Sequence, residues 1–153
     1  MESSGASGDT GSGCFLCDYP RRGPEHDAET LLLFRGEHAF VVMNLYPYNS
    51  GHLLVAPYEH TGNLEELSSE VATEMMAITQ RTIAALKAVY RPDAFNVGMN
   101  LGKSAGAGIP DHLHTHLVPR WDGDTNFMPI LGETKVLPET LEQTYARLRP
   151  QFA

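Results

Sequence analysis

The sequence has few cysteines, an excess of negative charge and no long hydrophobic run. Its 11 lysines and arginines are outnumbered by 19 aspartates and glutamates, so the net charge is −8. This balance argues against non-specific binding to nucleic acid or to anionic membranes, although a local cluster of hydrogen-bond donors can still hold a nucleotide. No apolar stretch is long enough to cross a bilayer. We therefore expect neither nucleic acid nor a membrane among its partners.

The first 13 residues are rich in glycine and serine, and they lack the hydrophobic segment of a signal peptide. We expect residues 1–13 to form a disordered tail and the protein to be cytoplasmic. The 153-residue length suits one domain with one hydrophobic core, which we place at residues 14–153. A hydrophobic content of 42% and a charged content of 20% are typical of globular proteins.

The only two cysteines, Cys14 and Cys17, are separated by two residues. In a reducing compartment this spacing suggests metal binding or redox chemistry more than a structural disulfide. A thioredoxin-like role is disfavoured, because the motif precedes any βαβ pattern. Two thiolates can bind tetrahedral zinc if two further ligands complete the site. The candidate ligands are histidines: His26, His38, His60 and His112. A reduced pair without metal is the alternative.

Alternating and apolar-rich segments predict five strands, at residues 31–34, 38–43, 52–56, 95–101 and 111–120. The first two are joined by a turn and are expected to form an antiparallel hairpin. A long amphipathic helix is predicted over residues 68–90 and a shorter one over 139–149, whereas residues 20–29 are expected to be a polar loop. Helices and strands do not alternate regularly, which favours an α+β fold with an antiparallel sheet.

The segment 111–120 carries His112, His114 and His116 at every second position. Alternate side chains of a strand share one face, so we expect the three imidazoles to lie on one face of the sheet. The residues between and after them are expected to face the core: Leu113, Thr115 and Leu117. Clustered imidazoles serve metal binding, acid–base catalysis or nucleophilic catalysis.

A glycine-rich stretch, residues 102–108, lies directly before the histidines. Such a loop can turn several backbone N–H groups toward an anion, although many glycine-rich loops are only turns. A phosphate held beside a nucleophilic imidazole is an arrangement suited to phosphoryl or nucleotidyl transfer. The position of the loop beside the histidines therefore favours a phosphate-containing substrate.

The run from His112 to Val118 resembles the signature of the histidine triad (HIT) superfamily, in which three alternating histidines are followed by apolar residues. Thr115 departs slightly from that pattern. Further resemblance lies in Asn-Leu at 44–45, Gly-His-Leu-Leu-Val-Ala-Pro at 51–57 and Asn-x-Gly at 100–102. Residues 44–49 and 118–127 are most similar to the fragile-histidine-triad-like branch, which acts on dinucleoside polyphosphates.

The resemblance implies a HIT-like fold with a five-stranded antiparallel sheet, one long helix and a C-terminal helix. It implies that His114 is the nucleophile that attacks the α-phosphorus and forms a nucleotidyl-histidine intermediate, with His116 contacting phosphate oxygens or assisting the leaving group. Nucleotide-binding roles fall on two groups of residues. The nucleoside side has Asn44, Leu45 and, if it does not merely fill the strand interior, His52. The phosphate side has Asn100, Gly102, Ser104, Ala107 and Gly108.

Many members of the superfamily carry a glutamine in the phosphate loop, where this sequence has Ala107 and Gly108. Ser104 or Lys103 is a candidate replacement for that group. The departure leaves the acceptor open: water makes the protein a hydrolase of dinucleoside polyphosphates such as diadenosine tetraphosphate, and inorganic phosphate makes it a phosphorylase or adenylyltransferase. Two further hypotheses are a weakly catalytic nucleotide-binding module and an enzyme with a catalytic metal bound by all three histidines.

Resemblance to zinc-containing triad relatives, and to galactose-1-phosphate uridylyltransferases, selects His60 and His112 as the metal ligands beside Cys14 and Cys17. The metal is then structural zinc, and only His114 and His116 are catalytic. The superfamily also implies a homodimer, with the helix at 68–90 and the strand at 95–101 as the interface elements.

Overall fold

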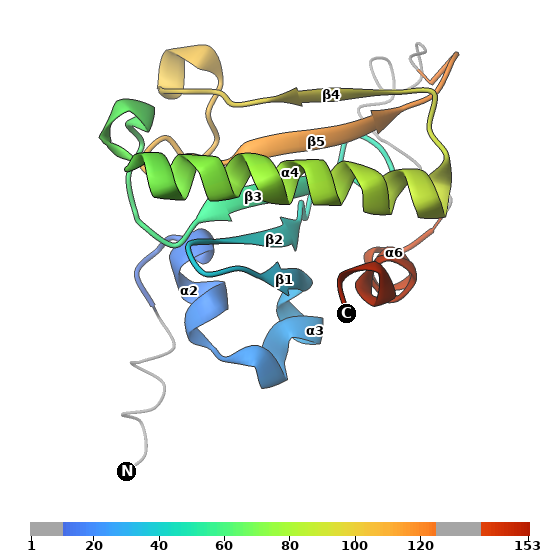
Figure 1. The fold of residues 1–153 in the computed structure, drawn as a ribbon, viewed down its shortest axis with the longest axis horizontal. Helices are drawn as coiled ribbons and strands as arrows, with labels where there is room; N and C mark the ends of the chain where they lie inside the picture. Colours follow the sequence, from blue (N-terminus) through green and yellow to red (C-terminus); the bar gives the residue numbers. More distant parts are fainter. Residues whose placement is uncertain (1–10, 125–138) are drawn as a thin grey trace.

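The computed structural model describes residues 11–124 and 139–153, which fold around one five-stranded antiparallel sheet (Figure 1). The order of the strands across the sheet is β1–β2–β3–β5–β4. Their bounds are Leu32–Arg35 for β1, Ala39–Met43 for β2, Leu53–Pro57 for β3, Ala94–Gly98 for β4 and Thr115–Arg120 for β5. The predicted α+β class and the antiparallel sheet are therefore confirmed.

The longest helix, α4 (Ser69–Tyr90), crosses the sheet in Figure 1. It begins at Ser68, whose side chain accepts a hydrogen bond from the Val71 N–H, and it ends at Arg91 in the left-handed conformation. The C-terminal helix α6 (Leu141–Leu148) begins with a reciprocal capping box between Thr140 and Gln143. Two short N-terminal helices, α2 (Phe15–Arg21) and α3 (Asp27–Thr30), precede the sheet.

The two faces of the sheet bury separate apolar clusters because neighbouring residues of a strand point to opposite sides. The cluster between the sheet, α4 and the C-terminal segment contains one set of sheet-side residues, among them Val41, Val55, Leu113 and Leu117. The cluster under α2 takes the alternate set: Leu32, Phe40, Val42, Leu54 and Ala56, together with Leu16 and both cysteines. The predicted inward direction of Leu113, Thr115 and Leu117 is confirmed, since they are 2%, 7% and 0% exposed.

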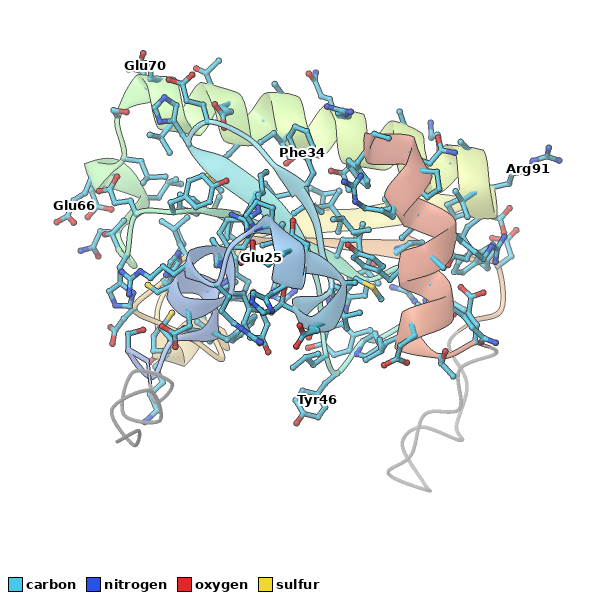
Figure 2. All side chains as sticks on the ribbon, turned by 90° about the horizontal axis from the view of Figure 1, so that it is seen from below. Glu25, Phe34, Tyr46, Glu66, Glu70 and Arg91 are labelled. Atoms are coloured by element: carbon cyan, nitrogen blue, oxygen red, sulfur yellow. The ribbon has the colours of Figure 1, made fainter. Side chains whose placement is uncertain are left out.

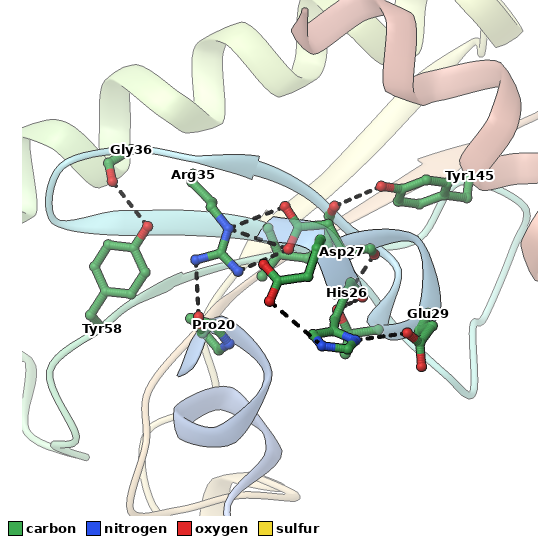
Figure 3. A network of polar contacts seen from close by, with 11 residues as sticks. Pro20, His26, Asp27, Glu29, Arg35, Gly36, Tyr58 and Tyr145 are labelled. Atoms are coloured by element: carbon green, nitrogen blue, oxygen red, sulfur yellow. Dashed lines mark hydrogen bonds and ion pairs between the residues drawn. The ribbon is translucent and has the colours of Figure 1, made fainter. Parts of the chain in front are cut away.

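Arg35 ties the N-terminal helices to the sheet (Figure 3). Its guanidinium contacts the Asp27 carboxylate on α3 at 2.8 Å and donates to the Pro20 carbonyl at the end of α2 at 3.0 Å. Both charged side chains of this pair are largely buried, and its several hydrogen bonds compensate for the lost hydration. The connection matters for the site because α2 and the residue before it carry the two cysteines.

The strand register places His116 in the middle of the sheet. It lies opposite Leu54 of β3 on one side and opposite Gly98 of β4 on the other. The loop between β2 and β3, residues 44–51, ends beside β5 at Gly51, which has a φ of 80°. A Cβ there would lie 3.1 Å from Leu86 and 3.2 Å from Pro119. Glycine is therefore favoured both by the positive φ and by the lack of space for a side chain.

The largest differences from the predictions lie at residues 20–29, at the start of β5 and at the end of β4. Residues 20–29, expected to be a loop, include the end of α2, a 3₁₀ turn at Pro24–His26 and most of α3, because short amphipathic turns give little periodic signal. Strand β5 begins only at Thr115, and β4 ends at Gly98. Of the predicted tail, residues 1–10 lie outside the described part of the chain, and Ser12 binds Asp18 at 3.0 Å. Among the described residues, no helix combines the length and apolarity needed to span a membrane.

Candidate functional site

Three imidazoles meet on the sheet face opposite α4. The rings of His114 and His116 are in edge-to-face contact, with centroids 4.9 Å apart. The rings of His116 and His52 are 5.1 Å apart, and their nitrogens Nδ1 and Nε2 lie at 2.9 Å. His52 is 1% exposed and His114 is 7% exposed, whereas His116 is partly exposed. The structure therefore brings His52 into the site with His114 and His116.

The hydrogen bonds of these rings decide which nitrogens carry protons. Nδ1 of His114 lies 3.0 Å from the carbonyl oxygen of His112, which can only accept, so Nδ1 holds the proton. In the neutral ring, Nε2 is then left with its lone pair. Among the described residues, no hydrogen bond is made to that Nε2. This is the protonation state that a nucleophilic imidazole needs.

The tautomer of His116 follows from a backbone N–H. The N–H of Tyr48 donates to Nδ1 of His52 at 3.1 Å, so the proton of the neutral His52 ring lies on Nε2. That Nε2–H donates to Nδ1 of His116, which leaves His116 with its own proton on Nε2. The arrangement gives a lone pair on His114 and an N–H donor on His116, side by side.

Burial keeps the rings of His52 and His116 neutral. It lowers the pKa of His52 to about 4, and the positive charges that His116 and His114 would carry act in the same direction. Burial also lowers the pKa of His116, with a smaller contribution from His114. His52, expected either to line the nucleoside site or to fill the strand interior, is both buried in that interior and in contact with the site.

Asn44, predicted to bind a ribose, stands at the edge of this cluster. Its Oδ1 accepts the Tyr46 N–H at 3.1 Å, and its Nδ2 lies 3.2 Å from Nε2 of His52. The neighbouring side chains are exposed: Leu45 is 38% exposed, Tyr48 is 64% exposed, and Tyr46, which projects from the body of the protein in Figure 2, is 85% exposed. Tyr48 also stacks on His52 with 5.0 Å between the ring centroids.

β4 ends at Gly98, which pairs with His116. The 102–108 loop follows β4 closely in sequence, and Asn100 lies between the two. Gly102 and Gly106 have φ values of 92° and 95°, which side chains rarely adopt. Three N–H groups of the loop, those of Ala105, Gly106 and Ala107, donate to the carbonyls of Gly102 and Lys103. They are engaged within the loop, so an anion would be bound by other N–H groups of this exposed segment.

A second cluster joins Cys14, Cys17, His60 and His112, whose donor atoms all lie within 4.8 Å of one another. Nδ1 of His112 is 3.4 Å from each sulfur, and Nδ1 of His60 is 3.2 Å from Cys17 Sγ and 3.3 Å from His112 Nδ1. Donors around a tetrahedral zinc ion lie about 3.3–3.8 Å apart, given Zn–S and Zn–N bonds of about 2.3 and 2.0 Å. The four residues therefore fit such an ion in both chemistry and spacing.

His112 has a single proton position that suits this cluster. Its Nε2 lies 2.8 Å from the carbonyl oxygen of Pro57, so Nε2 carries the proton and Nδ1 presents a lone pair to the other three donors. The predicted row of three histidines is thus divided: the ring of His112 contacts His60, with centroids 5.2 Å apart, and His114 and His116 lie outside the metal cluster. This division disfavours a metal bound by all three.

Sequence reasoning did not identify three groups of the site: the Tyr48 N–H, the Pro57 carbonyl and the Asn49 side chain. The first two belong to the backbone and leave no side-chain signal. The sequence marks Asn49 only as one member of the similar stretch 44–49.

The chain is similar to known proteins in sequence and in fold. The family model for the HIT domain matches residues 25–123. An AP-4-A phosphorylase from Mycobacterium tuberculosis is 49% identical over 127 residues, which are 83% of this chain and 65% of that protein. This chain therefore spans slightly less than two thirds of the length of that relative.

Two solved structures have the same fold over nearly the whole chain. A Zn-bound histidine triad family protein from Mycobacterium smegmatis has a TM-score of 0.70 and 25% identity, covering 90% of this chain and 91% of its own. A hypothetical histidine triad nucleotide-binding protein from Sulfolobus tokodaii has a TM-score of 0.72 and 26% identity, covering 91% of each chain.

The low pKa of His52 predicts acid-sensitive folding. The unfolded chain, with a histidine pKa near 6.5, binds a proton that the folded state resists until about pH 4, so stability decreases as pH decreases through this interval. Between pH 7 and pH 4.5 the expected loss from His52 is about 2 kcal/mol.

Urea unfolding of the wild type and His52→Gln at both pH values measures this contribution. The glutamine does not titrate, so the variant should lose about 2 kcal/mol less than the wild type. Equal losses would show that His52 is not held neutral by the fold.

Proposed function

The chain belongs to the HIT-domain family, and from that premise we propose that it cleaves dinucleoside polyphosphates with His114 as the nucleophile. The observation that carries the proposal is the hydrogen bond from Nδ1 of His114 to the His112 carbonyl, which leaves the Nε2 lone pair for attack. Support for the substrate class comes from the relative that is an AP-4-A phosphorylase and is 49% identical over 127 residues.

The proposed reaction has two steps. Nε2 of His114 forms a bond to the α-phosphorus of diadenosine tetraphosphate, and the bond from that phosphorus to its bridging oxygen breaks. ATP leaves, and AMP stays bonded to His114. The Nε2–H of His116 donates a hydrogen bond to the phosphate oxygens on which charge develops. An acceptor then breaks the phosphorus–nitrogen bond and restores the lone pair of His114.

We assign the nucleoside side to the exposed segment that includes Asn44 and Leu45, next to buried His52. The phosphate side is assigned to Asn100 and to the loop with Gly102, Ser104, Ala107 and Gly108. Asn100 is exposed and its Nδ2 would lie 3.9 Å from a Cβ at Gly106, so its side chain extends over this loop. The Asn100 amide, the Ser104 hydroxyl and the His116 N–H would supply donors to a phosphate, whereas the Ala107 N–H is engaged within the loop.

We propose inorganic phosphate as the acceptor, so that the second step gives ADP in place of AMP. The name of the relative from Mycobacterium tuberculosis supports this choice. The sequence is also consistent with it, because Ala107 and Gly108 have no side-chain amide to orient a water molecule. The overall reaction is then diadenosine tetraphosphate plus phosphate giving ADP plus ATP.

The first test follows product formation from diadenosine tetraphosphate with and without phosphate. We expect ADP and ATP in equal amounts with phosphate, and a loss of about a thousandfold or more in rate for His114→Ala. His26→Ala, at a partly exposed histidine paired with Glu29, is the matched control and should keep full activity.

Two results of this experiment contradict separate parts of the proposal. Turnover by His114→Ala at the wild-type rate would remove the nucleophile. AMP and ATP as the products in the presence of phosphate would replace the phosphorylase with a hydrolase that uses the same histidine.

We further propose that Cys14, Cys17, His60 and His112 bind a structural zinc ion. The spacing of the four donors and the lone pair of His112 Nδ1 support this, as does the Zn-bound relative from Mycobacterium smegmatis. Zinc bound there would hold the Cys14–Cys17 segment against the sheet. Catalysis itself requires no metal in this proposal.

Metal analysis of the purified protein should find about one zinc per chain, and Cys17→Ser should lose it together with part of the thermal stability. His38→Ala, which changes a histidine outside the cluster, should keep the metal. A folded wild-type protein that neither contains zinc nor becomes more stable when zinc is added would contradict the proposal.

The nucleotide substrate and the reduced thiols support a cytoplasmic location, which we propose together with a homodimer. β4 is an edge strand whose residues are exposed except for half-buried Phe95, and Val97 is 47% exposed. Two further exposed apolar residues extend the surface, Leu101 at 43% and Met76 of α4 at 62%. An open edge of this kind can pair with the same edge of a second copy.

Sedimentation velocity should give a mass of twice 16.8 kDa for the wild type. The double variant Val97→Glu and Met76→Glu should be monomeric, because dimerisation would bury two negative charges in the interface. Leu64→Glu, at an exposed residue of another segment, is the control and should leave the dimer intact. A wild type that sediments as a monomer at micromolar concentrations would be decisive against this interface.

A further inference from the structure

The 44–51 loop is closed onto His52 by three hydrogen bonds. The Asn44 N–H donates to the His52 carbonyl at 3.1 Å, and the His52 N–H donates to the Asn49 carbonyl at 3.2 Å. The third bond, from the Tyr48 N–H to Nδ1 of His52 at 3.1 Å, is the one that sets the tautomer of the ring. Backbone position in this loop therefore controls a proton in the site.

The side chain of Asn49 fastens this loop to the end of β5. Its Nδ2 donates to the Pro119 carbonyl at 3.0 Å and to the Asp124 carboxylate at 2.7 Å. Both partners only accept, so the position needs a side chain that donates two hydrogen bonds from one nitrogen, as the amide of asparagine does. Asp124 is itself held by the guanidinium of Arg120 at 2.9 Å and by the Trp121 N–H at 3.0 Å.

We propose that Asn49 is a positioning residue: it holds the Tyr48 N–H on His52 and thereby fixes on Nε2 of His116 the proton offered to the substrate. Asn49 binds the end of β5 and so holds the loop in place. The Tyr48 N–H of that loop then donates to Nδ1 of His52, and His52 Nε2–H donates to Nδ1 of His116. Asn49 acts through its neighbour and is not assigned a contact with the substrate.

If the loop is released, the positions of the His52 and His116 protons change, because each neutral ring has one donor and one acceptor nitrogen. Without the Tyr48 N–H, Nδ1 of His52 loses its shorter donor contact and keeps only the Asn44 amide at 3.4 Å, so the ring can move its proton from Nε2 to Nδ1. Nε2 of His52 then faces Nδ1 of His116 as an acceptor. His116 must place its proton on Nδ1, and its Nε2 ceases to be a donor. The residues assigned to the nucleoside, Asn44 and Leu45, lie on the same loop.

The variant that tests this is Asn49→Asp, which keeps the size of the side chain but sets a carboxylate against Asp124 and the Pro119 carbonyl. Nitrogen NMR of the histidine side chains reports directly which nitrogen of His52 and His116 carries the proton. The wild type should show Nε2–H for both rings. Asn49→Asp should show a mixture of the two tautomers in both, and Asn63→Asp, on another exposed loop, should show the wild-type pattern.

A double variant separates the hydrogen bond from a general loss of stability. Adding Asp124→Asn to Asn49→Asp removes the repulsion between the two carboxylates. Residue 49 still faces the Pro119 carbonyl, and residue 124 still faces the Arg120 and Trp121 donors, so the double variant should recover the Nε2–H tautomers only in part. If Asn49→Asp does not fold, Asn49→Ser, which has one hydroxyl donor in place of two N–H donors, takes its place. Wild-type tautomers in a folded Asn49 variant would overturn the proposal.

The effect on turnover rests on the proposed function. Loss of the His116 donor should lower kcat for diadenosine tetraphosphate by about tenfold or more, with partial recovery in the double variant. If kcat were unchanged while the tautomers shifted, His116 would not be the donor. If the wild type does not turn over the substrate but the tautomers shift as expected, the proposed function fails and the positioning role of Asn49 stands.

Discussion

The hydrogen bond from His114 Nδ1 to the His112 carbonyl is the interaction on which the rest of the site depends. It joins residues two apart, so it requires one backbone conformation at His112, although β5 begins only at Thr115. That conformation is held from outside the strand, by the bond between His112 Nε2 and the Pro57 carbonyl and by contact with the two cysteines. Segments nearly a hundred residues apart thus determine which nitrogen of His114 is free.

Backbone groups also determine the proton positions of His112, His52 and His116. A neutral imidazole has one donor and one acceptor, so a single backbone group at one nitrogen decides the role of the other. The Pro57 carbonyl does this for His112, and the Tyr48 N–H does it for His52 and, through it, for His116. Burial keeps His52 and His116 neutral, without which the donor and acceptor assignments would be lost.

Much of the fold followed from local patterns. Five strands and the long helix were predicted, and the inward direction of Leu113 and Leu117 was confirmed, because burial on one face imposes a period of two or of 3.6 residues. The short helices α2 and α3 were missed, since they are stabilised by tertiary contacts such as Arg35 with Asp27 more than by their own periodicity. The site roles of His114 and His116 and the choice of His60 came from resemblance to the HIT family, not from periodicity.

The sequence by itself determined the α+β class, the clustering of three histidines before an apolar pair and the pairing of two thiols near the N-terminus. The set of Cys14, Cys17, His60 and His112 was expected from resemblance, and tertiary contacts bring its members together. Only the tertiary structure decided that His52 joins His114 and His116 and that Asn49 fastens their loop. The physical reason is that these assignments depend on hydrogen bonds between distant segments, many of them to backbone groups. Every residue has such groups, so no pattern of side chains along the chain reveals which of them will meet.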